Sequence, residues 1–302
     1  LKSYPTIGHL AKAPAKNIYK HWEGLGYYSR CKNLILTAKF IHKEMNGKFP
    51  CTYDELLALK GVGPYTAAAI ASFAFNLPYA VVDGNVFRVL SRFFGIKKVI
   101  DNNDGKKYFT SLANDLLDKR DPGNYNQAIM DFGAVICTPK NPGCKNCPLK
   151  SKCVANMEGL TDKLPIKKGI IERKSRWFYY LVIKQDGKVQ VRKRNSKDIW
   201  QNLYEFVLLE AQRSLTIDEI KDSAIVKSII RKSKTKIIDI SKLQKQQLTH
   251  QIIQGRFIYV RLKNEVWLPG YKAISINKLA KLPFPKFITG YLSENEPWAF
   301  ER

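Results

Sequence analysis

The sequence predicts a two-domain protein of the α+β class, in which an all-α domain is followed by an α/β domain. Three observations support this: helical periodicity through the first half of the chain, four closely spaced cysteines near the middle, and a change to aromatic and β-branched residues after them. The 302 residues are enough to form two hydrophobic cores. We place the helical domain at residues 1–158, a linker at 159–175 and the second domain at 176–302.

The composition is strongly basic, with 51 Lys and Arg against 26 Asp and Glu and a formal net charge of +25. Such a chain attracts polyanions, nucleic acids among them, in a salt-dependent way, although a lysine-rich composition also serves solubility. No apolar run approaches the about 20 residues of a membrane span, and we expect no signal peptide. We therefore expect a monomeric, cytoplasmic protein without membrane partners, which begins at Leu1 part-way into a longer parent.

The first predicted helices span residues 5–10, 15–25 and 32–46, and a glycine-rich turn separates the last two. This turn reads Gly24-Leu25-Gly26-Tyr27-Tyr28-Ser29-Arg30. Two glycines make it flexible, and the flat tyrosine rings that follow could wedge into a stack of bases. The alternative is that both tyrosines are buried packing residues, which the residues alone favour.

Two further helices are joined by a tight turn, because one ends near Leu59, Gly61-Val62-Gly63 follows, and Pro64 suits the first position of the next helix. This is a helix-hairpin-helix pattern. The glycines allow close backbone approach, and the amides at the start of the second helix form an anion site where a DNA phosphate can bind without any base being read. An ordinary helix–helix turn is the alternative.

Asp83 lies between the apolar run 79–82 and a predicted helix that begins near Asn85. An aspartate in this position is most often only an N-cap. A carboxylate near a phosphate-binding hairpin can also stabilise the positive sugar left when a base departs, as the second carboxylate of a glycosidase does. Beyond this point we predict helices at 106–118 and 125–136.

The most specific pattern is C-x6-C-x2-C-x5-C, formed by Cys137, Cys144, Cys147 and Cys153. Four thiolates this close can enclose a metal centre, and in an intracellular chain they are better read as metal ligands than as disulfides. The spacing alone leaves zinc and a [4Fe–4S] cluster both open. We expect Cys31 and Cys51 to be free thiols that pack against their neighbours.

The second domain is predicted to begin with a β-hairpin, in which strands 177–183 and 188–194 are joined by an Asp186-Gly187 turn. Further strands are predicted at 204–209, 235–240, 254–262 and 265–268, and helices at 217–227 and 276–281.

Residues 59–66, residues 81–92 and the cysteine set resemble the helix-hairpin-helix DNA glycosylases of the endonuclease III superfamily, and within them the adenine DNA glycosylases of the MutY type. The resemblance implies base-excision repair of double-stranded DNA, in which adenine mispaired with 8-oxoguanine or guanine is released by hydrolysis of its N-glycosidic bond. It also implies a [4Fe–4S] cluster on the four cysteines, as does Pro148 after the third of them. The cluster would hold a lysine-rich loop against DNA.

The resemblance assigns roles to single residues. Asp83 would be the catalytic carboxylate, with Asn85 and Tyr65 beside it. Tyr65 stands where the related lyases carry a Schiff-base lysine, and since a phenol cannot form an imine we expect no strand cleavage. The DNA-binding residues would be Gly61, Val62 and Gly63 of the hairpin, Ser29 and Arg30, and Tyr27, which would intercalate beside the lesion.

The same resemblance leaves the acid that protonates the leaving adenine unassigned. In the family it is a glutamate within a Leu-Gln-Gln-Thr-containing segment that does not occur in this sequence, and neither Glu23 nor Glu44 lies in a matching motif. A positioned acid contributes about 10²–10⁴-fold in rate. We therefore expect this chain by itself to be a weak or inactive glycosylase that still binds DNA.

The second domain resembles the Nudix-like C-terminal domain of adenine glycosylases, but no glutamate-rich Nudix signature follows Glu205-Phe206. Nucleotide pyrophosphate hydrolysis is therefore not expected. Leu248-Thr249-His250 stands where the family carries a Phe-Ser-His loop that reads 8-oxoguanine, so we assign Thr249 and His250 to lesion recognition and note that the aromatic residue is lost. The alternatives are another mismatch glycosylase or an abasic-site lyase on the same scaffold, or a non-enzymatic iron–sulfur DNA-binding protein.

Overall fold

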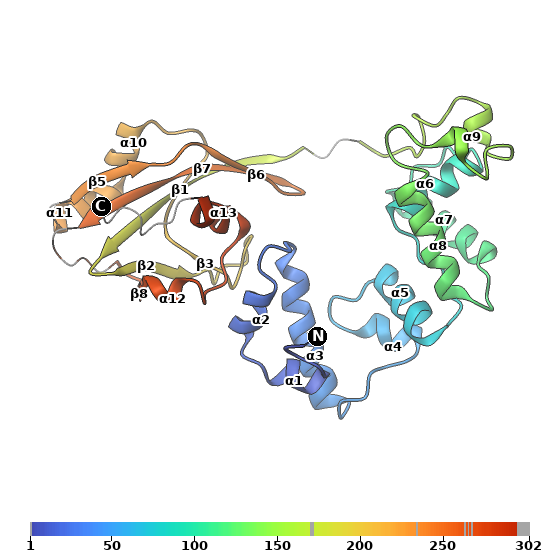
Figure 1. The fold of residues 1–302 in the computed structure, drawn as a ribbon, viewed down its shortest axis with the longest axis horizontal. Helices are drawn as coiled ribbons and strands as arrows, with labels where there is room; N and C mark the ends of the chain where they lie inside the picture. The colour runs from blue at the N-terminus through green and yellow to red at the C-terminus, as the bar shows by residue number, and fades with distance from the viewer. Residues whose placement is uncertain are drawn as a thin grey trace. The chain divides into compact units, whose positions relative to one another are not determined.

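The structure, a computed structural model, describes residues 2–169, 172–233, 235–262, 264, 266 and 268–294. Its contacts divide the chain into two compact units (Figure 1). The helical unit is Phe40–Ile170, and the sheet unit combines Leu1–Lys39 with Ile171–Arg302. Among the described residues, no helix has both the length and the apolar character needed to cross a membrane.

The helical unit contains α4 to α8, followed by two short helical segments. The bounds are α4 Tyr53–Ala58, α5 Pro64–Phe75, α6 Gly84–Phe93, α7 Asn103–Leu116, α8 Pro122–Val135, η1 Cys144–Asn146 and α9 Val154–Met157. Thr52 and Glu55 form a capping box at α4, and Asn102 caps α7. The core of α6, α7 and α8 is apolar and includes Val86, Leu90 and Phe109.

Helix α6 packs against α8 at very short range. A Cβ atom added to Gly133 of α8 would lie 2.7 Å from the Cβ atom of Asn85 in α6. Two carbon atoms that are not bonded to each other do not approach this closely. Only glycine therefore allows this spacing of the two helices. The spacing matters because Asn85 lies in the first turn of α6, directly after Asp83 and Gly84.

The sheet unit is built on a mixed eight-stranded sheet with the central order β3-β2-β1-β7-β5. The strands are β1 Lys174–Gln185, β2 Lys188–Lys193, β3 Tyr204–Glu205, β4 Val207–Ala211, β5 Thr235–Ile240, β6 Gln244–Gln247, β7 Gln251–Leu262 and β8 Lys272–Ser275. β1 and β7 run parallel, and the other strand pairs are antiparallel. The helices are α1 Ile7–Lys12, α2 Ala15–His21, α3 Tyr28–Glu44, α10 Ile217–Asp222, α11 Ala224–Lys232, α12 Ile276–Leu279 and α13 Lys286–Glu294. The last residues of α3, from Phe40 onward, belong to the helical unit.

Strand β1 is buried on both faces, which explains its continuous apolar run. One face, with Phe178 and Tyr180, joins a core that includes residues of α2, α3 and α13. The other face, with Tyr179 and Leu181, joins a core that includes residues of α10 and α11. The sheet is therefore covered by helical segments on each side.

Several elements differ from the sequence predictions for identifiable reasons. The strand expected at 204–209 is divided at Phe206, because β3 pairs with β2 whereas β4 pairs with β1. The helix expected at 217–227 is interrupted at Ser223, whose backbone is extended. Strands β6 and β8 and helix α13 were not predicted. Of the strand expected at 265–268, residues 265 and 267 lie outside the described residues.

The compact units also divide the chain differently from the expected domain boundaries. Residues 1–39, expected in the helical domain, fall in the sheet unit. The reason is packing, since Tyr19, Tyr28 and Cys31 lie in the same buried core as the aromatic residues of β1 and β7. Tyr19 also accepts a hydrogen bond at its hydroxyl from Asn202, at 3.1 Å.

Candidate functional site

Asp83 is the N-cap of α6, and its carboxylate accepts three hydrogen bonds. One oxygen, Oδ1, accepts the backbone N–H groups of Asn85 and Val86, both at 2.8 Å. The other oxygen, Oδ2, accepts from the Asn85 side-chain amide at 2.9 Å. The positive end of the helix dipole also favours negative charge here. The N-cap interpretation is thus confirmed, and the same contacts fix the orientation of a half-buried carboxylate.

Arg88, one turn along α6, links this carboxylate, through Asn85, to the segment that carries Cys137, the first of the four closely spaced cysteines. It is 7% exposed, and its guanidinium donates to Asn85 Oδ1 at 2.8 Å, to the Gly133 carbonyl at 2.6 Å and to the Cys137 carbonyl at 2.6 Å. Burial lowers the pKa of Arg88, and the nearby Cys137 and Asp83 oppose that shift. Arg88 was not predicted from the sequence, because its partners on α8 and at Cys137 are distant along the chain.

The hairpin between α4 and α5 has the geometry expected for an anion site. Gly61 has a left-handed backbone with φ of 81°, and the Val62 N–H donates to the Leu59 carbonyl at 3.1 Å to close the turn. Gly63 is the N-cap of α5, and no side chain caps this helix. Tyr65 lies in its first turn and is 48% exposed. Among the described residues, no hydrogen bond joins Tyr65 to Asp83.

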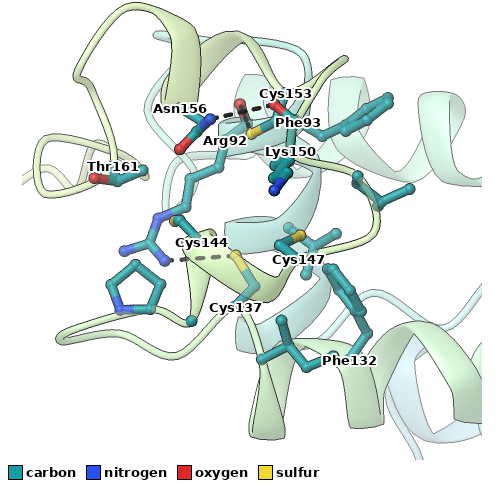
Figure 2. A pocket seen from close by; sticks show the side chains of 15 residues that line it. Arg92, Phe93, Phe132, Cys137, Cys144, Cys147, Lys150, Cys153, Asn156 and Thr161 are labelled. Carbon is teal, nitrogen blue, oxygen red and sulfur yellow. Dashed lines mark hydrogen bonds between the residues drawn. The ribbon is translucent and has the colours of Figure 1, made fainter.

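The four cysteines Cys137, Cys144, Cys147 and Cys153 line a single cavity, as Figure 2 shows. The space not filled by protein atoms is about 430 Å³, part of it open to solvent. Arg92 of α6 crosses the loop and donates to the Cys137 sulfur at 3.5 Å and to the Thr138 and Pro139 carbonyls at 2.7 and 3.2 Å. The loop is therefore attached to α6 by two arginines, Arg88 and Arg92.

The donor set consists of four thiols that face one cavity, a type that binds either zinc or an iron–sulfur cluster. Among the described residues, no group of three or more His, Cys, Asp or Glu side chains is close enough to bind one metal ion, yet four thiols face one cavity. Burial raises the pKa of the Cys144 thiol, and the neighbouring cysteines add to that shift, so four thiolates would require cationic charge between them. A bound metal centre would supply that charge and keep the thiols deprotonated.

The surface around these cysteines is basic. Lys140, Lys145, Lys150 and Lys152 are all exposed, and the Lys150 ammonium donates to the Lys145 carbonyl at 3.1 Å. Outside this loop, burial raises the pKa of the Cys31 thiol to about 11, which agrees with the expected packed thiol. Cys51 is also a free thiol, but the expected packing was wrong there, because its side chain is exposed.

In the sheet unit, the turn between α2 and α3 presents one tyrosine and buries the other. Tyr27 is 66% exposed and has a left-handed backbone, whereas Tyr28 is buried beside Phe284. Trp22 fixes the turn by donating its indole N–H to the Gly26 carbonyl at 2.9 Å. The alternative of two buried tyrosines is therefore wrong for Tyr27 and right for Tyr28. Ser29 and Arg30 are exposed in the first turn of α3.

Tyr27 and Thr249, which are 222 positions apart in sequence, lie together, with their hydroxyl oxygens 3.3 Å apart. Thr249 and His250 are exposed at the tip of the hairpin between β6 and β7. β7 begins at Gln251 rather than at the predicted residue 254, so the loop is a hairpin turn. Leu248 packs against the buried core. Leu248 therefore anchors the turn to that core.

Glu23, one of the two glutamates considered for the acid, and Glu205 both have structural partners. Glu23 pairs with Lys20 and accepts the Phe284 backbone N–H at 2.8 Å. Glu205 is 1% exposed and pairs with Arg192 and Arg194.

Comparison with known proteins finds two family matches, one in each half of the chain. The model of the HhH-GPD superfamily of base excision DNA repair proteins matches residues 1–115, and the NUDIX domain model matches residues 178–294. An adenine DNA glycosylase of Buchnera aphidicola subsp. Baizongia pistaciae is 34% identical over 289 residues, which cover 93% of this chain and 73% of that protein.

Two further relatives carry the same name. The adenine DNA glycosylase of Buchnera aphidicola subsp. Schizaphis graminum is 37% identical over 74% of this chain and 65% of its own length. The human adenine DNA glycosylase is 42% identical over 51% of this chain and 29% of its own length. The chain thus spans between 29% and 73% of the length of these three relatives.

Proposed function

Because the chain belongs to the adenine DNA glycosylase family, we propose that it removes adenine from mispaired double-stranded DNA by hydrolysing the N-glycosidic bond in base-excision repair. The observation that carries this proposal is the carboxylate of Asp83, which three N–H groups hold at the start of α6. Breaking the N-glycosidic bond leaves positive charge on the sugar. A fixed carboxylate stabilises that charge without having to reorganise.

The residues around Asp83 then have distinct tasks. Oδ2 of Asp83 has Asn85 as its only hydrogen-bond partner among the described residues, and we propose that this oxygen faces the sugar. Asn85 orients it, and Arg88 in turn orients Asn85. The hairpin at Gly61-Val62-Gly63 binds a DNA phosphate through the uncapped start of α5.

We further propose that the enzyme is monofunctional. Tyr65 lies in the first turn of α5, where a lysine would be needed to form an imine with the sugar, and a phenol cannot do so. Tyr65 contacts the reacting nucleotide instead. We assign the acid that protonates adenine to no residue of this chain, because neither Glu23 nor Glu44 lies in the family's motif and each pairs with a lysine.

The preferred mispair is adenine opposite 8-oxoguanine, with guanine as the weaker alternative. The proximity of Tyr27 and Thr249 supports this proposal, since it places an exposed aromatic ring beside an exposed hydroxyl group. Tyr27 would stack in the duplex while Thr249 and His250 bind the oxidised base. Ser29 and Arg30, exposed in the next turn, would bind the backbone.

We propose that Cys137, Cys144, Cys147 and Cys153 hold a [4Fe–4S] cluster. When bound, the cluster supplies structural cross-linking of the loop. The exposed lysines of that loop then bind DNA phosphates electrostatically. We also propose that the protein acts as a monomer in the cytoplasm, associated with the nucleoid.

The test is single-turnover release of labelled adenine from a duplex with adenine opposite 8-oxoguanine. It compares this chain with the same chain extended at its N-terminus by the glutamate-bearing segment of an adenine DNA glycosylase. We expect release chiefly from the extended form. In that form Asp83→Asn should lower the rate by about 10²–10³-fold, as expected for loss of one fixed charge at a transition state, with little change in DNA affinity. Asparagine also preserves the cap.

The matched control is Asp121→Asn, which changes the N-cap residue of α8 in the same unit and should leave the rate unchanged. Retention of the rate in Asp83→Asn would contradict the catalytic assignment. Release from this chain alone would show that an acid exists among its residues. Strand cleavage would contradict the monofunctional proposal, and tight binding without release would favour a non-enzymatic role.

A further inference from the structure

We infer that Gln251 and Arg176 are positioning residues for the lesion-reading turn, and that they act through Thr249 and His250. This inference rests on the proposed recognition of 8-oxoguanine. It concerns how the turn is kept in a binding-competent shape before DNA arrives.

The turn is closed at its base by backbone hydrogen bonds. The Leu248 N–H donates to the Gln251 carbonyl at 2.8 Å, which closes the hairpin. The Lys174 N–H of the neighbouring parallel strand β1 donates to the His250 carbonyl at 3.1 Å. These bonds fix the main chain at residues 248 and 250, whereas the exposed side chains of Thr249 and His250 extend beyond them.

The side chain of Gln251 connects the turn to a network of ion pairs centred on Arg176. Its carbonyl oxygen accepts from Arg176 Nη1 at 3.2 Å. The same guanidinium donates to both carboxylate oxygens of Asp198, each at 2.8 Å, and to both of Glu210, at 2.7 and 3.0 Å. All five N–H donors of Arg176 are therefore used.

This arrangement fixes Arg176 independently of the turn. Two carboxylates hold its planar group in place, and the guanidinium carbon lies 4.9 Å from the centre of the Phe178 ring. Gln251 therefore receives its hydrogen bond from a group whose position the sheet already determines. A lysine at position 176 could not reproduce this fork of donors.

The sharpest test removes only the link between the network and the turn. Gln251→Met keeps the length of the side chain and all four bonds from Arg176 to the carboxylates, but it lacks the acceptor. The measurement is the affinity of the chain for two labelled duplexes, in which a non-hydrolysable adenine analogue lies opposite 8-oxoguanine or opposite guanine. Because binding is measured, the test needs no catalytic acid.

We expect Gln251→Met to lower the ratio of the two affinities by about 2- to 10-fold, the usual effect of one hydrogen bond, with the melting temperature nearly unchanged. Gln254→Met is the matched control, since it changes the same residue type on the same strand outside this network, and it should keep the wild-type ratio. Gln251→Glu restores an acceptor for Arg176 and should also keep the ratio, although its charge weakens binding to both duplexes.

The possible results distinguish the proposed recognition of 8-oxoguanine from the role inferred for Gln251 and Arg176. A wild-type chain that binds both duplexes equally would refute the proposed recognition of 8-oxoguanine, and this inference with it. A wild-type preference that Gln251→Met leaves intact would refute the inference alone. Equal losses of preference in Gln251→Met and Gln254→Met would also overturn it, because the effect would then not depend on Arg176.

Discussion

The carboxylate of Asp83 caps α6 and is also the group that we propose for catalysis. The two tasks use different oxygens, since Oδ1 accepts both backbone amides, whereas the part of the chain that the structure describes offers Oδ2 the Asn85 side chain alone. Capping therefore does not compete with catalysis at this residue. It supplies the fixed orientation that electrostatic stabilisation of a transition state requires.

Asp198 is a second residue whose contacts affect the protein measurably. Its carboxylate pairs with Arg176 and Arg194. The hydrogen bonds from Arg176 are the main cause of a lowered pKa at Asp198, and burial opposes them. A lowered pKa in the folded state means that the pairing stabilises the protein above the ordinary aspartate value of about 3.9. This stabilisation is lost as the pH falls from that value through the lower folded-state pKa.

We therefore predict that Asp198→Asn lowers the stability of the sheet unit at neutral pH but makes its stability less sensitive to acid. Denaturant unfolding between pH 7 and pH 2 checks this, with the difference between wild type and variant shrinking below about pH 4. Asp186→Asn, in the exposed turn between β1 and β2, is the control and should track the wild type. A difference that stays constant down to pH 2 would contradict the prediction.

At the scale of elements, the contact between α6 and α8 determines where the catalytic carboxylate lies. Gly133 allows the two helices to approach at Asn85, and its carbonyl accepts a hydrogen bond from Arg88. One residue of α8 thus contacts both side chains that support Asp83. The position of the N-terminus of α6 depends on a helix that is far away in sequence.

We predict that Gly133→Ala lowers the free energy of unfolding by about 1–3 kcal/mol, as overpacking does. It should also slow adenine release, because Asn85 must move. Alanine normally stabilises a helix relative to glycine by about 0.5–1 kcal/mol, so the sign of the effect is diagnostic. Thermal melting and single-turnover release are the two measurements.

Gly290→Ala is the matched control, since it lies in α13 and an added Cβ there has no neighbour within 4 Å. It should be neutral or stabilising. An Asn85→Gly background removes the 2.7 Å contact with the Asn85 Cβ and leaves the two backbone contacts at 3.2 Å, so Gly133→Ala should then cost less in stability than it does in the wild type. An equal cost in both backgrounds would show that Gly133 does not act through Asn85.

At the scale of the whole molecule, the chain is organised as two compact units with separate cores. The cysteine loop lies entirely within the helical unit, attached to α6 by Arg88 and Arg92. A change at the loop should therefore affect that unit first. The sheet unit has its own hydrophobic cores on both faces of the sheet.

We predict that Cys144→Ser, which removes one proposed cluster ligand, lowers the unfolding temperature of the helical unit by several degrees and leaves that of the sheet unit unchanged. A loss of 1 kcal/mol shifts the midpoint of a domain of this size by roughly 4 °C. Calorimetry with iron analysis is the measurement, and Cys51→Ser, at an exposed thiol outside the loop, is the control. Equal destabilisation of both transitions would contradict the division into independent units.

Local patterns in the sequence determined much of this molecule. The cap at Asp83, the uncapped hairpin before α5, the cysteine spacing and the Asp186-Gly187 turn all depend on residues close together along the chain. Their conformations follow from short-range sterics and hydrogen bonding. For the same reason, the type and approximate place of most helices and strands could be predicted, although the division at Phe206 could not.

Only the tertiary structure decided which distant residues meet. Arg88 reaches Gly133 and Cys137, Tyr27 reaches Thr249, and Arg176 joins Asp198, Glu210 and Gln251. It likewise decided that residues 1–39 pack with the sheet. None of these contacts leaves a periodic or local signal in the sequence, because each depends on how two buried surfaces pack after their elements have formed.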